Sequence, residues 1–152
     1  MAYLFDTGIL LRLANKGDNQ HSTVRDAVRI LIADREELLI ATQNVAEFCN
    51  VATRPIANNG LGLFPKEALN LLGRDIEPIC KALVERETSY HELKRLIATY
   101  SVRSKQVHDA RLVAMMLAWQ IENILTLNDR DFRRYEPEGI TVVTPAELIS
   151  SA

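Results

Sequence analysis

The chain opens with an apolar run that ends in an acid and continues into a second apolar run, Tyr3-Leu-Phe-Asp-Thr-Gly-Ile-Leu-Leu11. The first three residues predict a short buried strand, and the residues after Asp6 predict a helix that begins almost at once. Asp is a common N-cap residue, which by itself explains its presence at position 6. A strand that feeds directly into a helix is the building unit of an α/β fold.

The same alternation continues through the rest of the chain. Apolar runs predict further strands at 38–41, 124–127 and 140–143 and a weaker one at 83–84. Helical patterns are found at 21–35, 42–53, from Pro65 onward, 90–100, 106–120 and from Pro145 onward. We therefore predict a single domain over residues 1–152, an α/β protein built as a three-layer α/β/α sandwich with a largely parallel central sheet.

Composition narrows the class of protein. The 152 residues include 18 Lys+Arg and 20 Asp+Glu, and 47% are hydrophobic, which suits a chain with a sizeable core rather than a disordered one. The formal net charge of -2 gives no general attraction to nucleic acid, although a local basic patch is compatible with it. No apolar run approaches the ~20 residues of a membrane helix, and no basic segment precedes the first apolar residues as in a secretory signal. We expect a cytoplasmic protein without a membrane contact.

Cysteine and histidine offer no metal site. The chain has only Cys49 and Cys80, far apart, and we expect both to be unpaired thiols. Its three histidines are scattered, so no spacing suggests structural zinc. His108 is predicted to be structural, because successive helix residues point about 100° apart and it should project away from Asp109.

Acidic residues follow several of the predicted strands, and each has an ordinary explanation. Glu47 lies on a polar helix face that can simply be solvated, Asp109 suits the first turn of its helix, and Asp129 and Asp131 suit a turn. In a parallel sheet, however, these positions approach one edge, where ligands bind. Converging carboxylates repel one another unless a cation compensates them, and Mg²⁺ prefers such oxygen ligands. The chemistry predicted for this arrangement is metal-assisted phosphodiester hydrolysis.

Four segments, in order along the chain, resemble the PIN-domain ribonucleases, particularly the VapC-type toxins of bacterial toxin-antitoxin pairs. These segments are Tyr3–Leu11, Thr42–Pro55, Gln106–Ala114 and Leu125–Phe132. The resemblance implies an endoribonuclease that depends on Mg²⁺ or Mn²⁺. It also implies a homodimer that a VapB-type antitoxin protein holds inactive.

The resemblance also assigns residues. The acidic cluster maps onto Asp6, Glu47 and Asp109, with a fourth acid from residues 128–131. Many PIN domains have an acid at the position of Asn128, so Asp129 and Asp131 compete for the fourth role, and the Arg-Asp-Phe ending favours Asp131. Two hydroxyls are expected beside the cluster, from Thr7 and Thr126, whereas Gly8 removes a side chain that many relatives have.

Other polar residues are candidates for supporting roles or for RNA contacts. Asn44 and Asn50 share the polar stripe of Glu47, and Asn128 is close to the fourth acid. Cations near strand ends could follow a phosphate backbone, although each one taken alone is better explained as ordinary surface charge or, for Arg111, as part of a salt bridge. These cations are Arg54, Arg103, Lys105, Arg111, Arg130, Arg133 and Arg134.

Three alternative functions compete with a ribonuclease toxin. A PIN nuclease could instead act in RNA processing or on DNA, but 152 residues leave little room for a substrate-selecting domain. A non-catalytic RNA-binding PIN module is disfavoured by the presence of Asp6, Glu47 and Asp109. A phosphoacceptor signalling domain would need a Lys after its last strands, and the final Lys of this chain is Lys105.

Overall fold

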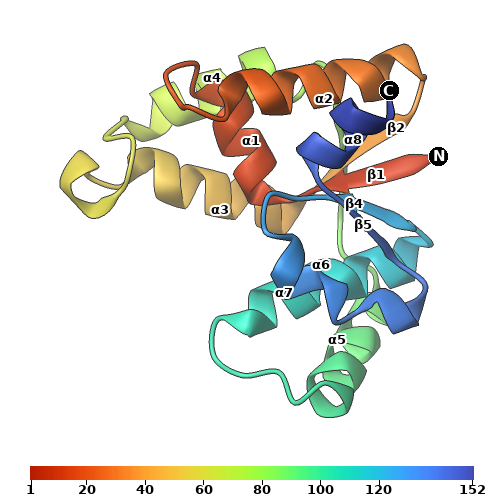
Figure 1. Cartoon of the computed structure of the whole chain (residues 1–152). Helices are drawn as coiled ribbons and strands as arrows, with labels where there is room; N and C mark the ends of the chain where they lie inside the picture. The colour runs from red at the N-terminus through yellow and green to blue at the C-terminus, as the bar shows by residue number, and fades with distance from the viewer.

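The computed structural model describes residues 1–152, which form a five-stranded sheet between two helical layers (Figure 1). All strand pairs are parallel and the order is β3-β2-β1-β4-β5. The strands are β1 (Ala2–Phe5), β2 (Glu37–Ala41), β3 (Lys81–Leu83), β4 (Asn123–Leu125) and β5 (Thr141–Val143). The α-helices are α1 (Thr7–Ala14), α2 (His21–Ala33), α3 (Thr42–Thr53), α4 (Pro65–Asp75), α5 (Glu87–Thr99), α6 (Gln106–Trp119), α7 (Asp129–Arg133) and α8 (Pro145–Ser151). Two short 3₁₀ turns are η1 (Ile56–Asn58) and η2 (Glu136–Glu138).

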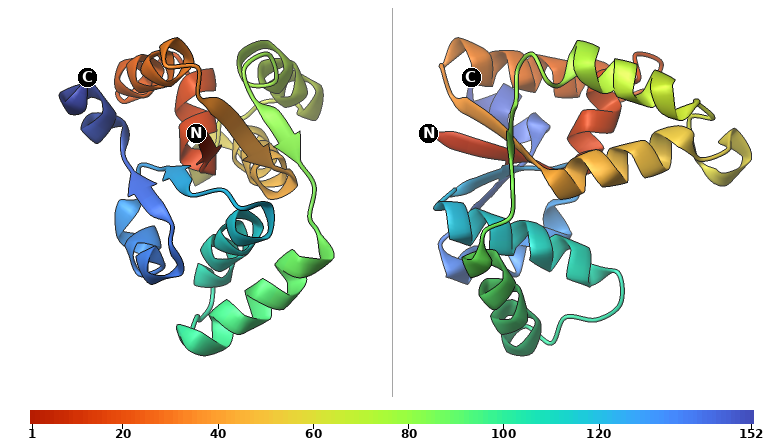
Figure 2. Two further views of the ribbon diagram at one scale, coloured as in Figure 1. Left: turned by 90° about the vertical axis from the view of Figure 1, so that its right-hand side faces the viewer. Right: turned by 180° about the vertical axis from the view of Figure 1, so that it is seen from behind.

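Each face of the sheet has its own hydrophobic core. Alternate residues of a strand point to opposite faces, so Tyr3 and Phe5 pack with α1 to α4 while Leu4 packs with α5 to α7. The end-on view in Figure 2 shows the two helical layers with the strands between them. The largest fully buried side chains of the two cores include Phe48 on α3 and Phe132 on α7. The predicted three-layer sandwich is therefore confirmed, and its sheet is parallel throughout.

The order of the strands determines where a ligand site can form. From β1 the chain builds outward through β2 and β3, and it then returns to place β4 on the other side of β1. Leu4 is paired with Leu39 of β2 on one side and with Ile124 of β4 on the other. The gap between the carboxyl ends of β1 and β4 is thus the switch point of the sheet, the usual place for a ligand in such folds.

The element boundaries differ from the sequence-based prediction in a few places. The weak strand expected at 83–84 is β3 at 81–83, an edge strand along which the chain passes from the α4 layer to the α5 layer (Figure 2, right). The strand predicted at 124–127 ends at Leu125, so Thr126 and Leu127 lie beyond it. Cys49 and Cys80 are both free thiols, as expected. No helix combines the length and apolarity needed to cross a bilayer.

Candidate active site

Asp6 is fixed at the carboxyl end of β1 by two hydrogen bonds. One oxygen, Oδ1, accepts a bond from the backbone N–H of Thr7 at 2.8 Å, which makes Asp6 the N-cap of α1 as the sequence suggested. The other oxygen, Oδ2, accepts a bond from the hydroxyl of Thr126 at 2.7 Å. This second bond crosses the switch point between β1 and β4. The end of β4 therefore orients the carboxylate at the end of β1.

Glu47 is held on the second turn of α3 by groups on both of its oxygens. The hydroxyl of Thr7 donates to Oε2 at 3.0 Å, and the side-chain amide of Gln43 donates to Oε1 at 2.5 Å. Asn44, which is fully buried, donates to the Thr7 hydroxyl at 3.1 Å and accepts from the backbone N–H of Ala41 at 2.7 Å. This chain of bonds connects the start of α1 to the start of α3 and sets the rotamer of Glu47. Thr7 and Asn44 are thus side chains that orient a carboxylate.

Asp109 lies in the first turn of α6, on the opposite side of the sheet from Glu47. Desolvation raises its pKa to about 7, and the neighbouring charges of Asp6, Asp131 and Glu47 add to the increase, while Lys105 opposes it. Desolvation also raises the pKa of Asp6, against the hydrogen bonds from Thr126 and Thr7, and Glu47 and Asp131 contribute to the increase. Four acids distant in the sequence therefore act on one another electrostatically.

Three of these acids line a common cavity of about 540 Å³, here called the acid cavity. Its walls consist of Glu47, Asn50, Lys105, Gln106, His108, Asp109, Asn128 and Asp131. Asp6 does not line the acid cavity, although its charge is the neighbouring charge that raises the pKa of Asp109 most. Of the five carboxylates that the sequence singled out, three line the acid cavity and Asp6 acts on them electrostatically, whereas Asp129 does neither.

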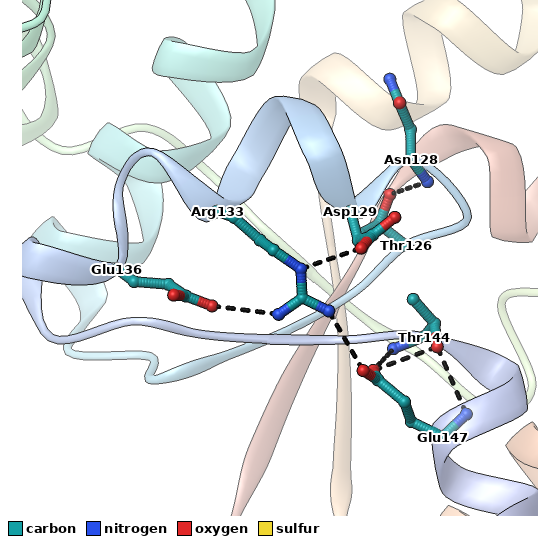
Figure 3. Close-up of polar contacts among 7 residues, drawn as sticks. All are labelled: Thr126, Asn128, Asp129, Arg133, Glu136, Thr144 and Glu147. Carbon is teal, nitrogen blue, oxygen red and sulfur yellow. Dashed lines mark hydrogen bonds and ion pairs between the residues drawn. The ribbon is translucent and has the colours of Figure 1, made fainter.

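The segment after β4 separates the two candidates for the fourth acid. Asp131 lines the acid cavity, and its Oδ2 accepts a bond from the Asn128 side chain at 2.5 Å. Asp129 instead binds Arg133, which bonds to its Oδ2 at 2.8 Å and lowers its pKa. Figure 3 shows the guanidinium of Arg133 contacting two further carboxylates, those of Glu136 and Glu147. Asp129 is thus part of a surface ion-pair network that attaches α7 to α8.

The predicted RNA-contacting cations divide into two groups. Lys105 lines the acid cavity, and Arg130 and Arg134 line a smaller neighbouring pocket. The other four cations line neither the acid cavity nor the smaller pocket. Arg111 forms an ion pair with Glu85 at 2.5 Å, and Arg133 forms the ion pairs described above. Arg54 is the C-cap of α3, and Arg103 is exposed. The ion pair with Glu85 therefore gives Arg111 a structural role.

The structure also corrects one expectation and adds residues that the sequence did not single out. His108 is exposed and lines the acid cavity, which differs from its prediction as a structural residue that projects away from Asp109. Gln43 is buried and bridges the two faces of the sheet, because its amide donates to Glu47 and also to the backbone carbonyl of His108 at 2.8 Å. Gln106 and Tyr135 were not predicted as site residues, and both line the smaller pocket.

The carboxylates of the acid cavity are the type of ligand that a hard divalent cation prefers, although they do not form a complete coordination shell. No group of three His, Cys, Asp or Glu residues is arranged to hold a metal ion directly. Mg²⁺, however, keeps several of its waters and commonly uses only one or two carboxylates together with substrate phosphate oxygens. Desolvation and the neighbouring acids raise the pKa of Asp109, and Lys105, which lines the same cavity, opposes this increase only in part. These residues therefore fit Mg²⁺ or Mn²⁺ as oxygen ligands.

Comparison with known proteins identifies the family of the chain. The PIN domain family matches residues 3–137, and the chain belongs to this family. No curated protein shows significant sequence similarity to the chain.

Among solved structures, the chain is similar in fold to several toxin-antitoxin proteins. VapC20 of Mycobacterium tuberculosis, described as a sarcin-ricin loop cleaving toxin, is 15% identical with a TM-score of 0.63, over 91% of this chain and 96% of that one. VapBC-1 from nontypeable Haemophilus influenzae is 16% identical with a TM-score of 0.68, over 96% and 99% of the two chains. FitAcB from Neisseria gonorrhoeae is 17% identical with a TM-score of 0.67, over 95% and 98%. At sequence identities this low, the similarity shows only that the fold is shared.

Proposed function

We propose that this PIN-domain protein is a divalent-metal-dependent endoribonuclease, the toxin of a type II toxin-antitoxin system. The observation that carries the proposal is the acid cavity, where Glu47 from one face of the sheet meets Asp109 and Asp131 from the other. A structural role would not require acids from opposite faces to converge, because their mutual repulsion is unfavourable without a cation. A metal-dependent nuclease uses converging acids of this kind to hold its cation.

Different residues of the site have different roles in the proposed catalysis. Asp6, Glu47, Asp109 and Asp131 would hold Mg²⁺ or Mn²⁺. The bound ion supplies Lewis-acid chemistry, in which it polarises the phosphoryl oxygen, lowers the pKa of the attacking water and stabilises the leaving oxygen. Thr126 and Gln43 keep the carboxylates of Asp6 and Glu47 in fixed orientations through the bonds described above. Asn50 and Lys105 line the cavity, where they can bind the RNA backbone.

We also propose an antitoxin partner and a homodimer. The solved structures with the same fold include toxin-antitoxin complexes such as VapBC-1 and FitAcB. The end of the molecule that carries the α3–α4 connection exposes the large apolar side chains of Ile56, Phe64 and Leu69. Exposed apolar side chains of this kind favour a protein–protein contact. These residues therefore support a protein partner, in agreement with a VapB-type antitoxin or a second copy of the chain.

The proposal is tested by RNA cleavage in vitro. The purified protein should cut RNA with Mg²⁺ or Mn²⁺ and stop when EDTA is added. Asp6→Asn and Asp109→Asn should each lower the rate at least about 100-fold, since even outer-shell partners of a metal site can have effects of this size. Asp34→Asn, an exposed acid at the end of α2, is the matched control and should cut normally. Cleavage that continues unchanged in EDTA or in both site variants would contradict the proposal.

A bacterial growth experiment tests the proposed role as a toxin. Expression of the chain alone should stop bacterial growth, whereas expression of the Asp6→Asn variant should not. Equal toxicity of the two would show that killing does not depend on the acidic site. Purified protein that binds RNA without cutting it would instead favour the non-catalytic alternative.

A further inference from the structure

A second, smaller pocket of about 190 Å³ adjoins the acid cavity and has no role in the function described so far. Its lining residues come from α6, α7 and the residue pair that follows α7: Gln106, Asp109, Arg130, Asp131, Arg134 and Tyr135. This side pocket shares Asp109 and Asp131 with the acid cavity, so the two spaces meet along one acidic wall. A chain of phosphates that lies across the acid cavity can therefore continue into the side pocket.

The most informative residue of the side pocket is Tyr135. Its side chain is 1% exposed, its ring packs edge-to-face on that of Tyr100 at 4.9 Å, and its hydroxyl has no hydrogen-bond partner. A buried hydroxyl without a partner is costly, and phenylalanine would keep the ring packing without that cost. The hydroxyl is therefore a donor without a partner within the chain.

Charged residues near Tyr135 act on the pKa of its hydroxyl. Burial raises the pKa of this hydroxyl, the guanidinium of Arg134 lowers it, and Asp109 and Asp131 raise it further. The hydroxyl thus lies within electrostatic reach of both carboxylates that separate the side pocket from the acid cavity. Tyr135 also lines the side pocket together with both of these acids.

The two arginines of the side pocket differ from most others in the chain. Arg130 makes no side-chain hydrogen bond or ion pair, and Arg134 donates only to the Gln106 side chain at 3.4 Å and to the backbone carbonyl of Tyr100. By contrast, Arg133 between them in sequence contacts three carboxylates. Two guanidiniums without a carboxylate partner, beside a free hydroxyl, form a set of donors for an anion.

We propose that the side pocket is a phosphate subsite for the RNA substrate, in which Arg130, Arg134 and the hydroxyl of Tyr135 bind a backbone phosphate next to the one at the acid cavity. The inference rests on the proposed ribonuclease function and adds to it a binding site that determines how the RNA lies across the acids. Phosphodiesters carry one negative charge each, and arginine binds them in a bidentate manner.

Binding of a single-stranded oligoribonucleotide, followed by fluorescence anisotropy, tests the subsite. All variants are made in the Asp6→Asn protein, so that the RNA stays intact during the measurement. Tyr135→Phe and Arg130→Gln should each weaken binding about tenfold, the effect of losing a hydrogen bond to a charged group. Arg130→Gln should also reduce the slope of log affinity against log salt by about 0.7, the value for one phosphate contact on a single strand.

Matched controls separate the subsite from general effects. Tyr90→Phe and Arg29→Gln change an exposed tyrosine on α5 and an exposed arginine on α2, and both should bind RNA like the parent protein. Tyr135→Phe should melt at the same temperature as the parent or higher, because the hydroxyl it removes has no partner in the fold.

The possible results distinguish this inference from the proposed function. If the wild-type protein cuts RNA while Tyr135→Phe and Arg130→Gln bind it as tightly as the controls, the subsite is wrong and the ribonuclease function stands. If the parent protein binds no RNA and the wild type does not cut it, both proposals fall. Weakened binding confined to the two side-pocket variants supports the subsite.

Discussion

Asp109 carries a negative charge that the folded protein disfavours. Its pKa is raised to about 7 by desolvation and by three other carboxylates, with only Lys105 acting in the opposite direction. At pH values between the ordinary pKa of Asp109 and this raised value, Asp109 carries a proton in the folded protein and none in the unfolded chain. Stability attributable to Asp109 is therefore greatest in acid and is lost as the pH rises through about 7.

The metal-free protein should consequently be stabilised at high pH by Asp109→Asn. At pH 8 in EDTA we expect the variant to unfold with a free energy higher than the wild type by about 1–2 kcal/mol, a value discounted because the carboxyl is partly exposed. At pH 4 the two proteins should be nearly equal. Urea unfolding at both pH values measures this difference, and a variant less stable than the wild type at pH 8 would contradict the assignment of Asp109 as a repelled carboxylate.

The two acids of α7 should differ in their effect on metal binding. Asp131 lines the acid cavity, whereas Asp129 is bound to Arg133 on the surface. Asp131→Asn should weaken Mn²⁺ binding by about 10- to 100-fold, and Asp129→Asn should leave it nearly unchanged. Isothermal titration of the two variants with Mn²⁺ makes the comparison, and a loss of affinity in Asp129→Asn alone would reverse the assignment.

At the level of elements, the connection between α3 and α4 depends on a glycine. A Cβ atom at Gly60 would lie 1.9 Å from the backbone carbonyl oxygen of Arg54, so no side chain fits without movement of the backbone. Gly60→Ala should therefore reduce stability by about 1–3 kcal/mol, the usual cost of overpacking. Gly73, inside α4, meets only the end of the flexible Glu77 side chain at 3.6 Å.

Gly73→Ala is thus the matched control for Gly60→Ala. It should raise stability by roughly 0.5–1 kcal/mol, because alanine is the better helix former. Thermal unfolding of both variants and of the wild type measures these changes in stability. A stabilising Gly60→Ala would mean that the connection between α3 and α4 has another shape.

The central elements could be predicted from the sequence because each has a strong local pattern. Most residues of β1, β2 and β4 are apolar and buried, since parallel strands in the middle of the sheet are covered on both faces. β3 gave only a weak indication: it is a three-residue edge strand with Lys81 and Ala82 exposed, so its sequence has little apolar character. Leu69 continues the apolar pattern of Ala68 and Leu72 in the sequence, but it is exposed on α4, on a surface that the chain alone leaves uncovered.

The site was predictable where topology alone decides the position of a residue. Asp6 follows from the rule that strand ends meet at one edge of the sheet, because it comes directly after β1. Gln43 could not be found in this way, because a buried amide that joins two elements has no signature in the sequence. Tyr135 resembles an ordinary core aromatic until its hydroxyl is seen to lack a partner. Arg54, a candidate RNA contact, lies at the end of α3, two turns of helix or about 10 Å beyond Glu47.

On the scale of the whole molecule, the site joins the two hydrophobic cores. The layer of α1 to α4 supplies Thr7, Gln43 and Glu47, and the layer of α5 to α7 supplies Asp109 and Asp131 (Figure 1). Asp6 lies between them at the end of β1. The acid cavity is therefore complete only when both layers are packed on the sheet, so the site depends on the entire fold.

A crystal soaked in Mn²⁺ and measured for anomalous scattering tests this account most directly. We predict an anomalous peak at the switch point between β1 and β4, with carboxylate oxygens from both helical layers among its ligands. A well-soaked crystal with no peak there, or with manganese bound only elsewhere on the surface, would contradict the claim that the fold gathers these acids to hold a metal ion.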